Sequence, residues 1–246
     1  MPPTEKIPMS HKPIDLIESF DALNIMVDDQ IEAIYAIKKN INEIEHIIHE
    51  IYLRLVNNAS SKLIYAGAGT SIRIGVQDGA ELLPTFGWPK KRIGFIIAGG
   101  KKALLEPVEN AEDDEQQARE DVFNGNISNE DVVMAISASG NTPYTCMVAT
   151  EAKNKGALVV GISNNKKGIL LKKCSTSIIL DTGSEVIVGS TRLKAGTAQK
   201  MCLNIISSYL MVKMGRVKNG QMTHMVVTNQ KLKERKKRIT NYKYEE

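Results

Sequence analysis

Three glutamates stand at positions from which a carboxyl group could do acid–base chemistry. Glu81 lies in an apolar stretch, AELLP, and Glu112 lies in an acidic one, ENAEDDE. A carboxyl group that is withdrawn from water, or crowded by like charges, can exchange a proton near neutral pH. Glu185 follows the last of the apolar runs described below and is a third candidate. For Glu81 and Glu112, spacing alone fits solvated helix residues better than catalytic groups, so both interpretations stay open here.

Other kinds of active site find little support in the sequence. No G-x-S-x-G is present and no histidine lies beside a Ser- or Cys-bearing loop, which argues against nucleophilic catalysis. Cys146, Cys174 and Cys202 form no C-x-x-C pair, so they fit a reducing compartment and do not fit a metal site. His46 and His49 share a helical face without a third partner, which is typical of solvated residues. We therefore expect no metal site.

Residues 62–87, KLIYAGAGTSIRIGVQDGAELLPTFG, read as a strand, a tight glycine turn and a helix. Glycines at such a turn let the backbone approach a ligand closely, and the N–H groups of the first helical turn favour an anion. The hydroxyls of Thr70 and Ser71 would add donors where a phosphate oxygen sits. A dinucleotide fingerprint would need glycine where Ile72 stands, and no Gly-Lys-Ser/Thr follows to make a P-loop. Taken alone, the motif also fits a turn without a ligand.

Apolar runs that predict strands alternate with helical segments along the middle of the chain. The runs cover residues 63–66, 92–97, 131–136, 157–162 and 175–180. This alternation predicts a parallel sheet with helices on both faces, and ligands bind such sheets at the carboxyl ends of the strands. Those ends read GAGTS, AGG, SASGNT, SNN and TGSE, and they include Ser137, Ser139, Asn141 and Thr142. So many hydroxyl and amide groups suggest a site for a phosphorylated polyol; the alternative is that the loops are simply polar.

Helical periodicity predicts the elements that cover the sheet. Apolar residues recur every three or four positions from 29 to 55, which predicts one long amphipathic helix. Further helices are expected at about 14–23, from 70, across 101–121 with an interruption near Pro107, and at 143–155, 190–214 and 226–238. We accordingly divide the chain into an N-terminal helical segment (1–57), an α/β domain (58–225) and a C-terminal helix with a basic tail (226–246).

The composition of the 246 residues, 42% hydrophobic and 24% charged, allows an ordinary globular core. No apolar run is long enough to span a membrane and the N-terminus lacks a signal peptide's apolar centre, so we expect a cytoplasmic protein without a membrane partner. The net charge of +4 resides in residues 231–246, which hold seven Lys/Arg and three Glu. The body is neutral, which argues against a nucleic-acid partner, and the tail fits a solvated helix better than a binding segment.

Several longer strings carry a family resemblance: IYAGAGTS, DGAELLPTFG, IAGG, PVENAEDD, ISASGNTPY and GSTRLKAGTAQK. Across roughly residues 10–238 the chain resembles the N-acetylmuramic acid 6-phosphate etherases, bacterial members of the sugar isomerase (SIS) superfamily. The resemblance implies a flavodoxin-like three-layer α/β sandwich, in which helices flank a five-stranded parallel sheet and a long N-terminal helix precedes it. It also implies a homodimer with sites near the subunit interface, and no metal or organic cofactor.

The activity that the resemblance implies is a lyase reaction in cell-wall recycling. The D-lactyl ether of N-acetylmuramic acid 6-phosphate, a small-molecule phosphosugar, would be cleaved to N-acetylglucosamine 6-phosphate and D-lactate. The family's mechanism opens the sugar ring, removes the C2 proton, expels lactate from C3 and adds water to the resulting alkene. Elimination needs a base for the C2 proton and an acid for the departing oxygen, so two carboxyls suffice.

The resemblance also assigns residues. Glu81 matches the catalytic glutamate that follows the glycine-loop helix, and Glu112 matches the one in the family's AED motif. We predict that Glu81 is the acid at the ether oxygen and Glu112 the base at C2. The superfamily's phosphosugar loops match Thr70, Ser71, Ser137, Ser139, Asn141 and Thr142, and its last site segment matches Glu185, Ser190 and Lys194.

Departures from the family pattern fall close to these residues. Ile72 stands where GTSGRLG has its internal glycine, and Leu82 and Leu83 stand where DASECPPTFG has Cys and Pro. Asn141 replaces an arginine at the phosphate loop, and NGQMTHM, residues 219–225, stands near the usual GNLMVD. The small helical domain that usually follows is expected to be absent. These differences bear on substrate scope, since both glutamates are retained.

Two alternative functions stay open at this stage. A non-catalytic phosphosugar sensor would fit the replaced arginine, the missing domain and the basic tail. An aldose–ketose isomerase would use Glu185 as its base. Product analysis separates the three functions, because they predict lactate release, no turnover, or an isomerised sugar without lactate.

Overall fold

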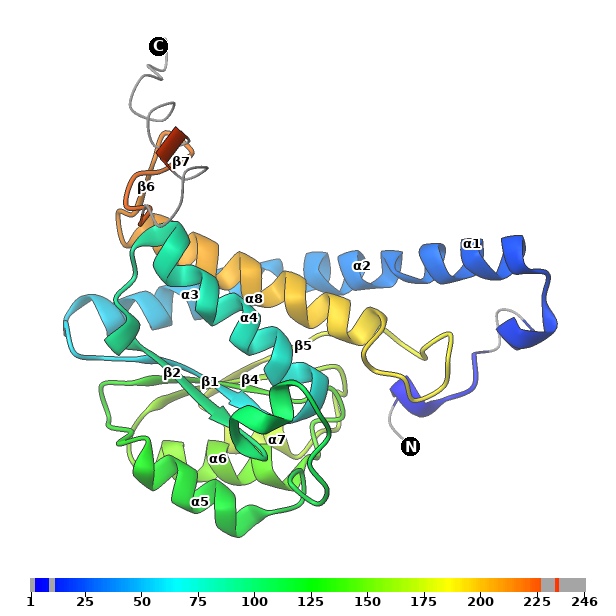
Figure 1. Cartoon of the computed structure of the whole chain (residues 1–246), viewed down its shortest axis with the longest axis horizontal. Helices are drawn as coiled ribbons and strands as arrows, with labels where there is room; N and C mark the ends of the chain where they lie inside the picture. The colour runs from blue at the N-terminus through cyan, green and yellow to red at the C-terminus, as the bar shows by residue number, and fades with distance from the viewer. Residues whose placement is uncertain (1–2, 9–11, 227–232, 235–246) are drawn as a thin grey trace.

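The structure is a computed structural model, and it describes residues 3–8, 12–226 and 233–234. Five parallel strands form its main sheet in the order β2-β1-β3-β4-β5 (Figure 1). They are β1 (Leu63–Gly67), β2 (Ile93–Ile97), β3 (Val132–Ile136), β4 (Leu158–Ser163) and β5 (Thr176–Ile179). Every strand begins and ends within one residue of the range expected from its apolar run, so the predicted α/β sheet is confirmed.

Helices cover both faces of the sheet (Figure 1). On one face lie α3 (Ile41–Val56), α4 (Gly69–Phe86) and α8 (Lys194–Lys213), and on the other α5 (Glu115–Asn124), α6 (Pro143–Asn154) and the short α7 (Leu170–Lys173). Successive side chains of a strand point to opposite faces, and the core divides accordingly. Leu63 and Tyr65 of β1 pack against α3 and α8, whereas Ile64 and Ala66 pack against α5 and α6. Full burial of each larger side chain contributes roughly 1.5–3 kcal/mol.

The prediction of a single long helix from 29 to 55 is wrong. The structure has two helices there, α2 (Ile31–Lys39) and α3, and α1 (Ser19–Asp29) precedes them. The break falls at Asn40, whose φ of −109° and ψ of 14° are not helical. Its side-chain amide donates to the carbonyls of Ala36 and of Ile179 at the end of β5, both at 2.8 Å. Because this contact is made across the fold, the helical periodicity of the sequence does not reveal it.

Other helix boundaries also differ from expectation. The segment 14–23 holds a 3-10 turn (η2, Ile14–Leu16) followed by α1, and the segment 101–121 overlaps a 3-10 helix (η4, Gly100–Leu104) and α5. Asp114 caps α5, because its carboxylate accepts a hydrogen bond of 2.8 Å from the Gln117 N–H. Apart from 226 and 233–234, the last predicted helix and the basic tail lie outside the described residues. The division of the chain into three segments stays a prediction.

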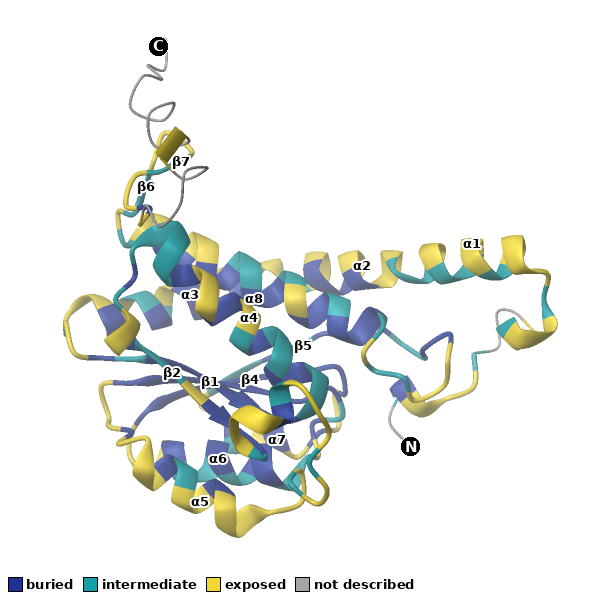
Figure 2. Cartoon of the chain, in the orientation of Figure 1, coloured by how far each residue is buried: buried dark blue, intermediate teal, exposed yellow. Residues whose placement is uncertain are grey.

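A rod made of α1 and α2 projects beyond the sheet (Figures 1 and 2). None of the α1 residues is buried, and Phe20, Leu23 and Val27 are 76%, 62% and 68% exposed. Ile31 and Ile34 continue the series on α2. Spacings of three and four residues place these five side chains along one side of the rod, and we call them the apolar stripe. An exposed apolar surface of this kind is suited to binding another protein chain.

Trp88, which follows α4, is buried at the end of the sheet that lies opposite the rod. The guanidinium groups of Arg92 and Arg216 lie 4.2 and 5.2 Å from its ring centroid. Arg92 also donates to the carbonyls of Leu55 and Ser61, at 2.6 and 2.8 Å. This cluster therefore holds the end of α3 and the approach to β1 against the segment that contains Arg216. That segment leads into a hairpin made of β6 (Val217–Lys218) and β7 (Gln221–Met222).

Replacing Arg92 by leucine should destabilise the fold. The substitution leaves buried carbonyl oxygens without their donor, so we expect the free energy of unfolding to fall by about 3 kcal/mol. Urea denaturation followed by circular dichroism measures this change. The neighbouring exposed Lys91 provides the control, since Lys91→Leu removes a charge without breaking these bonds. A loss below about 1 kcal/mol for Arg92→Leu would contradict the proposed importance of the cluster.

Candidate active site

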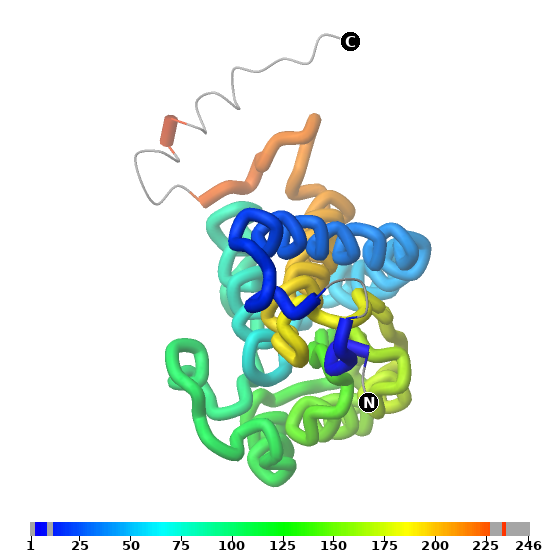
Figure 3. Tube along the Cα trace, turned by 90° about the vertical axis from the view of Figure 1, so that its right-hand side faces the viewer, coloured from blue at the N-terminus to red at the C-terminus, as the bar shows by residue number. Residues whose placement is uncertain are grey.

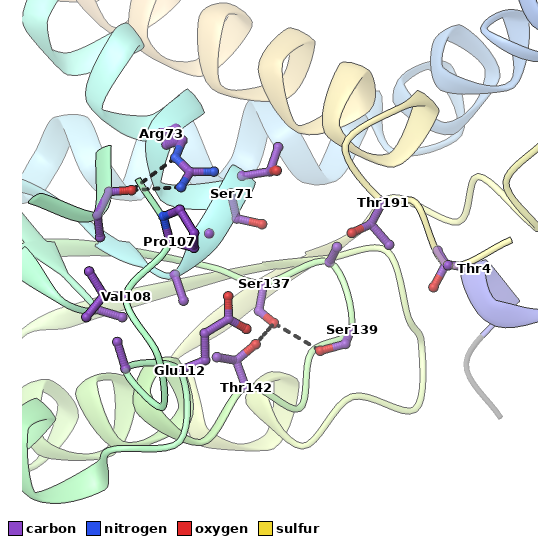
Figure 4. Close-up of a pocket in the computed structure, with 18 of the residues that line it drawn as sticks. Thr4, Ser71, Arg73, Pro107, Val108, Glu112, Ser137, Ser139, Thr142 and Thr191 are labelled. Atoms are coloured by element: carbon purple, nitrogen blue, oxygen red, sulfur yellow. Dashed lines mark hydrogen bonds between the residues drawn. The ribbon is translucent and has the colours of Figure 1, made fainter. Parts of the chain in front are cut away.

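A cavity of about 420 Å³ opens at the carboxyl ends of β1 and β3 (Figure 4). These strands are neighbours in the sheet, yet β1 leads into α4 on one face and β3 into α6 on the other. Ligands of doubly wound sheets bind at such a crevice. The lining comes from the loops after β1, β2 and β3, from the turn η1 (Pro3–Glu5) and from the segment before α8. Its residues are Thr4, Glu5, Ala68, Gly69, Thr70, Ser71, Arg73, Ala98, Ala103, Pro107, Val108, Ala111, Glu112, Ser137, Ala138, Ser139, Thr142, Gly189 and Thr191.

The loop after β3 brings three hydroxyl groups together at the cavity wall. Ser137 Oγ lies 2.9 Å from Thr142 Oγ1 and 3.4 Å from Ser139 Oγ (Figure 4). Gly140 closes this loop with a φ of +67°, and its N–H donates to Ser137 Oγ at 3.1 Å. A Cβ at position 140 would lie 2.6 Å from Ser163 Oγ, so the turn requires glycine. We call these three residues, Ser137, Ser139 and Thr142, the hydroxyl cluster.

Two helices begin at the cavity. Pro143 is the first residue of α6, and α4 begins at Gly69 directly after β1, where no side chain caps its first turn. The first N–H groups of an α-helix have no partner inside the helix, and they favour an anion. Thr70 and Ser71 also line the cavity at this point. In α6, however, Pro143 has no N–H and the Tyr144 N–H donates to the Glu112 carbonyl, so the N–H donors come chiefly from the start of α4. Together with the hydroxyl cluster and the dipole of α6, they can bind a phosphate group.

Glu112 reaches the same place from the segment that precedes α5. A Cβ on Gly69 would lie 2.9 Å from Glu112 Oε1, so the carboxylate lies directly against the glycine turn. The backbone of Glu112 is held as well, because its carbonyl accepts a 2.9 Å hydrogen bond from the Tyr144 N–H in the first turn of α6. The structure therefore places one carboxylate beside an anion site, where it can accept a proton from a bound ligand.

Five of the predicted site residues do not line the cavity. Glu81 is exposed on α4, and Asn141 accepts a 3.0 Å hydrogen bond from the Ile169 N–H through its side-chain oxygen. Ser190 is half-buried in the turn before α8, beside the lining residues Gly189 and Thr191. The remaining two, Glu185 and Lys194, take part in contacts inside the fold.

Glu185 and Lys194 are both buried at the start of α8. The Glu185 carboxylate accepts hydrogen bonds from the backbone N–H groups of Ala195 at 2.9 Å and Lys194 at 3.2 Å, so it caps the helix. Burial raises the pKa of Glu185, and these two hydrogen bonds oppose the shift. The Lys194 ammonium pairs with Asp29 at the end of α1, with 2.6 Å between Nζ and Oδ1. Both side chains therefore hold α8 in place within this chain.

Several lining residues were missed by the sequence analysis. Thr4 and Glu5 form one wall, where the Thr4 carbonyl accepts a 3.1 Å hydrogen bond from the Gly189 N–H; Figure 3 shows η1 beside the segment before α8. No local signal marks this contact, because about 185 residues separate the two segments. Arg73 could have been found, since it lies one helical turn beyond the glycine motif. Of the lining residues within the described ranges, it is the only Lys or Arg.

Comparisons with known proteins decide the family. The model described as "Glucokinase regulatory protein N-terminal SIS domain" matches residues 43–153, and the model described as "SIS domain" matches residues 106–207. The N-acetylmuramic acid 6-phosphate etherase of Deinococcus radiodurans is 40% identical over 239 residues, which are 97% of this chain and 78% of that protein. That of Geobacillus thermodenitrificans is 42% identical over 236 residues, 96% of this chain and 79% of that protein. The chain belongs to the N-acetylmuramic acid 6-phosphate etherase family.

Solved structures share the fold of this chain. An E. coli CFT073 protein, solved as a ligand complex, superposes with a TM-score of 0.58 at 16% identity, covering 83% of this chain and 97% of that one. The Vibrio vulnificus NanR protein complexed with ManNAc-6P gives 0.57 at 14% identity, covering 92% and 70%. Together with the match to the SIS domain model, these superpositions confirm the predicted three-layer SIS fold. Within the described ranges, no helix has both the length and the apolar character needed to cross a bilayer.

The contact between Gly69 and Glu112 yields a prediction. In Gly69→Ala the new methyl group meets the Glu112 carboxylate and the backbone, with a φ of +53°, becomes strained. We expect the affinity for N-acetylglucosamine 6-phosphate, measured by titration calorimetry, to fall about tenfold or more. Gly100→Ala is the matched control, because Gly100 has a φ of +68° and open space around it. Equal losses of affinity in the two variants would show that backbone strain alone is responsible.

Proposed function

We propose that the chain is a carbon–oxygen lyase that cleaves the D-lactyl ether of N-acetylmuramic acid 6-phosphate. The products are N-acetylglucosamine 6-phosphate and D-lactate, formed by elimination and then hydration, in the recycling of cell-wall amino sugars. The observation that carries the proposal is the Glu112 carboxylate against the glycine turn, beside a site for phosphate, in a chain about 40% identical to named etherases.

The phosphate of the substrate binds at the hydroxyl cluster and the two helix starts. Hydroxyl and backbone N–H donors match the oxygens of a phosphate group, and the helix dipoles favour its charge. Thr70 and Ser71 add hydroxyl donors from the first turn of α4. Anchoring at C6 fixes the sugar at one end, so that its C2–C3 bond can be held against a catalytic group.

Glu112 acts as the base in the elimination. In the open-chain form of the sugar, the aldehyde at C1 acidifies the C2 proton, which passes to the Glu112 carboxylate. The electrons of the C2–H bond form the C2=C3 double bond, and the C3–O bond breaks to release lactate. Water then adds across the double bond, with hydroxyl at C3 and a proton returned to C2. This sequence of steps needs only acid–base groups, so the proposal includes no metal and no organic cofactor.

Glu81 is proposed as the acid that protonates the departing oxygen, and a second copy of the chain supplies it. Within one chain Glu81 is exposed and lies outside the cavity lining, which supports its delivery to the site by a partner. The apolar stripe on α1 and α2 supports this homodimer, because Phe20, Leu23 and Val27 are left exposed by the single chain. Three free cysteines, Cys146, Cys174 and Cys202, support a cytoplasmic location for the enzyme.

The position of Glu185 favours the lyase over an aldose–ketose isomerase. Its carboxylate is buried, caps α8 and does not line the cavity, so it cannot serve as a base there without a rearrangement of the helix start. A non-catalytic phosphosugar sensor differs from the lyase in the outcome of one assay. The sensor would bind the phosphosugar and release no lactate.

Release of D-lactate from N-acetylmuramic acid 6-phosphate should require both glutamates. We expect Glu112→Gln and Glu81→Gln each to lower the rate at least ~100-fold, because each removes one proton-transfer group. An enzymatic D-lactate assay measures the rate. Glu109→Gln, an exposed acid close to Glu112, should stay near the wild-type rate. Well-folded wild-type protein that binds the sugar and releases no lactate would contradict the lyase and support the sensor.

Mixing the two inactive variants tests whether a second copy supplies Glu81. A mixed dimer holds one site with the Glu112 of one chain and the Glu81 of the other. Unfolding and refolding an equal mixture should therefore restore about a quarter of the wild-type rate. Refolded wild type controls for recovery. A mixture that stays inactive while wild type recovers would place both glutamates in the same chain.

A further inference from the structure

The substrate of the proposed reaction carries two anionic groups, and the part of the cavity wall that the structure describes offers a single cation. The phosphate is attached at C6 and the carboxylate belongs to the lactyl group on O3. Among the described lining residues, Glu5 and Glu112 are acidic and Arg73 is the only basic one. Arg73 can bind either the phosphate or the lactyl carboxylate, and the choice between them rests on the proposed function.

The phosphate has a site that does not need Arg73. The hydroxyl cluster and the start of α6 are built from the loop after β3, whereas Arg73 stands on α4 beside the loop after β2. Figure 4 shows the hydroxyls of Ser137, Ser139 and Thr142 grouped together, with Arg73 in a separate part of the cavity wall. Neutral hydroxyl and N–H donors are sufficient for a phosphate group at a helix start. The cation is therefore available to the second anion.

Arg73 is oriented but not neutralised by its surroundings. Its Nε and Nη2 atoms donate to the Ala103 carbonyl at 3.1 and 2.8 Å, and Figure 4 shows Nη1 directed away from that carbonyl. A guanidinium has five N–H donors, so three remain for a ligand. No Asp or Glu in the described part of the chain lies within 4.0 Å of these nitrogens as an ion-pair partner.

The order of groups along the sugar matches the order of residues along α4. Gly69 and Arg73 are four residues apart, so they lie on the same side of the helix, one turn from each other. The Glu112 carboxylate lies against Gly69, and in the proposed mechanism it faces C2. The lactyl group is attached to C3, the next carbon. A sugar with C2 at Glu112 and its phosphate at the hydroxyl cluster can thus extend its lactyl group toward Arg73.

We propose that Arg73 binds the carboxylate of the lactyl group and thereby selects the ether-bearing phosphosugar. Its planar fork suits a carboxylate, with which it can form two parallel hydrogen bonds. The contact would hold the C3–O bond in position for elimination, and it would offset the repulsion that Glu5 and Glu112 exert on a second anion. Arg73 is in this account a specificity-determining residue, since it takes no part in proton transfer.

Binding measurements with two ligands test the proposal. N-acetylglucosamine 6-phosphate carries only the phosphate, whereas N-acetylmuramic acid 6-phosphate carries both anions. In a Glu112→Gln background, which prevents turnover, we expect Arg73→Met to weaken binding of the second ligand about 10- to 100-fold. Binding of the first ligand should change by less than about threefold. Arg73→Lys, which keeps the charge and loses the fork, should recover part of the difference.

The controls separate a ligand contact from a structural role. Lys101→Met removes an exposed cation from η4, outside the cavity lining, and should leave both affinities unchanged. In the otherwise wild-type enzyme, Arg73→Met should raise KM for the lactyl sugar. Equal weakening of both ligands would overturn the proposal and assign Arg73 to the phosphate or to the support of Ala103. A different outcome is that wild type releases no lactate, while Arg73→Met still weakens binding of N-acetylmuramic acid 6-phosphate alone. That result would refute the lyase and leave the contact between Arg73 and the lactyl carboxylate standing.

Discussion

The candidate site depends on the close approach of a carboxylate to a backbone position that has no side chain. A Cβ on Gly69 would lie 2.9 Å from Glu112 Oε1, and the φ of +53° at Gly69 is one that glycine adopts easily. The same residue starts α4 directly after β1, so it exposes the first N–H groups of that helix to the cavity. One glycine therefore leaves room for the Glu112 carboxylate and forms part of the anion site.

The sheet order brings the remaining donors to this point. Because β1 and β3 are neighbours and their helices leave on opposite faces, α4 and α6 both begin at the same cavity. The phosphate can then be bound by neutral donors, and the few charged groups remain for chemistry and selectivity. Glu112 supplies a carboxylate at the glycine turn, and Arg73 supplies a cation one helical turn away. In our proposal, the placement of each charge in a separate part of the cavity lets one site bind a doubly anionic sugar and still remove a proton from it.

The sequence predicts those parts of the structure that local pattern controls. Five apolar runs give the five strands, and the glycine turn with Thr70 and Ser71 is where the sequence places it. Contacts between distant segments could not be predicted. Asn40 ends a helix by bonding to Ile179, and Lys194 pairs with Asp29 instead of lining the cavity. Glu81 has the family's motif around it, yet its exposure follows from how α4 packs on the sheet, which no motif encodes.

The removal of the C2 proton by Glu112 is the central claim, and hydrogen exchange at C2 tests it most directly. N-acetylmuramic acid 6-phosphate would be incubated in D2O with Glu81→Gln and with Glu112→Gln, and the C2 proton signal followed by NMR. Our account predicts exchange with Glu81→Gln, which keeps the base and lacks the acid, and none with Glu112→Gln. Exchange that continues in Glu112→Gln would contradict the account, because another group would then be the base.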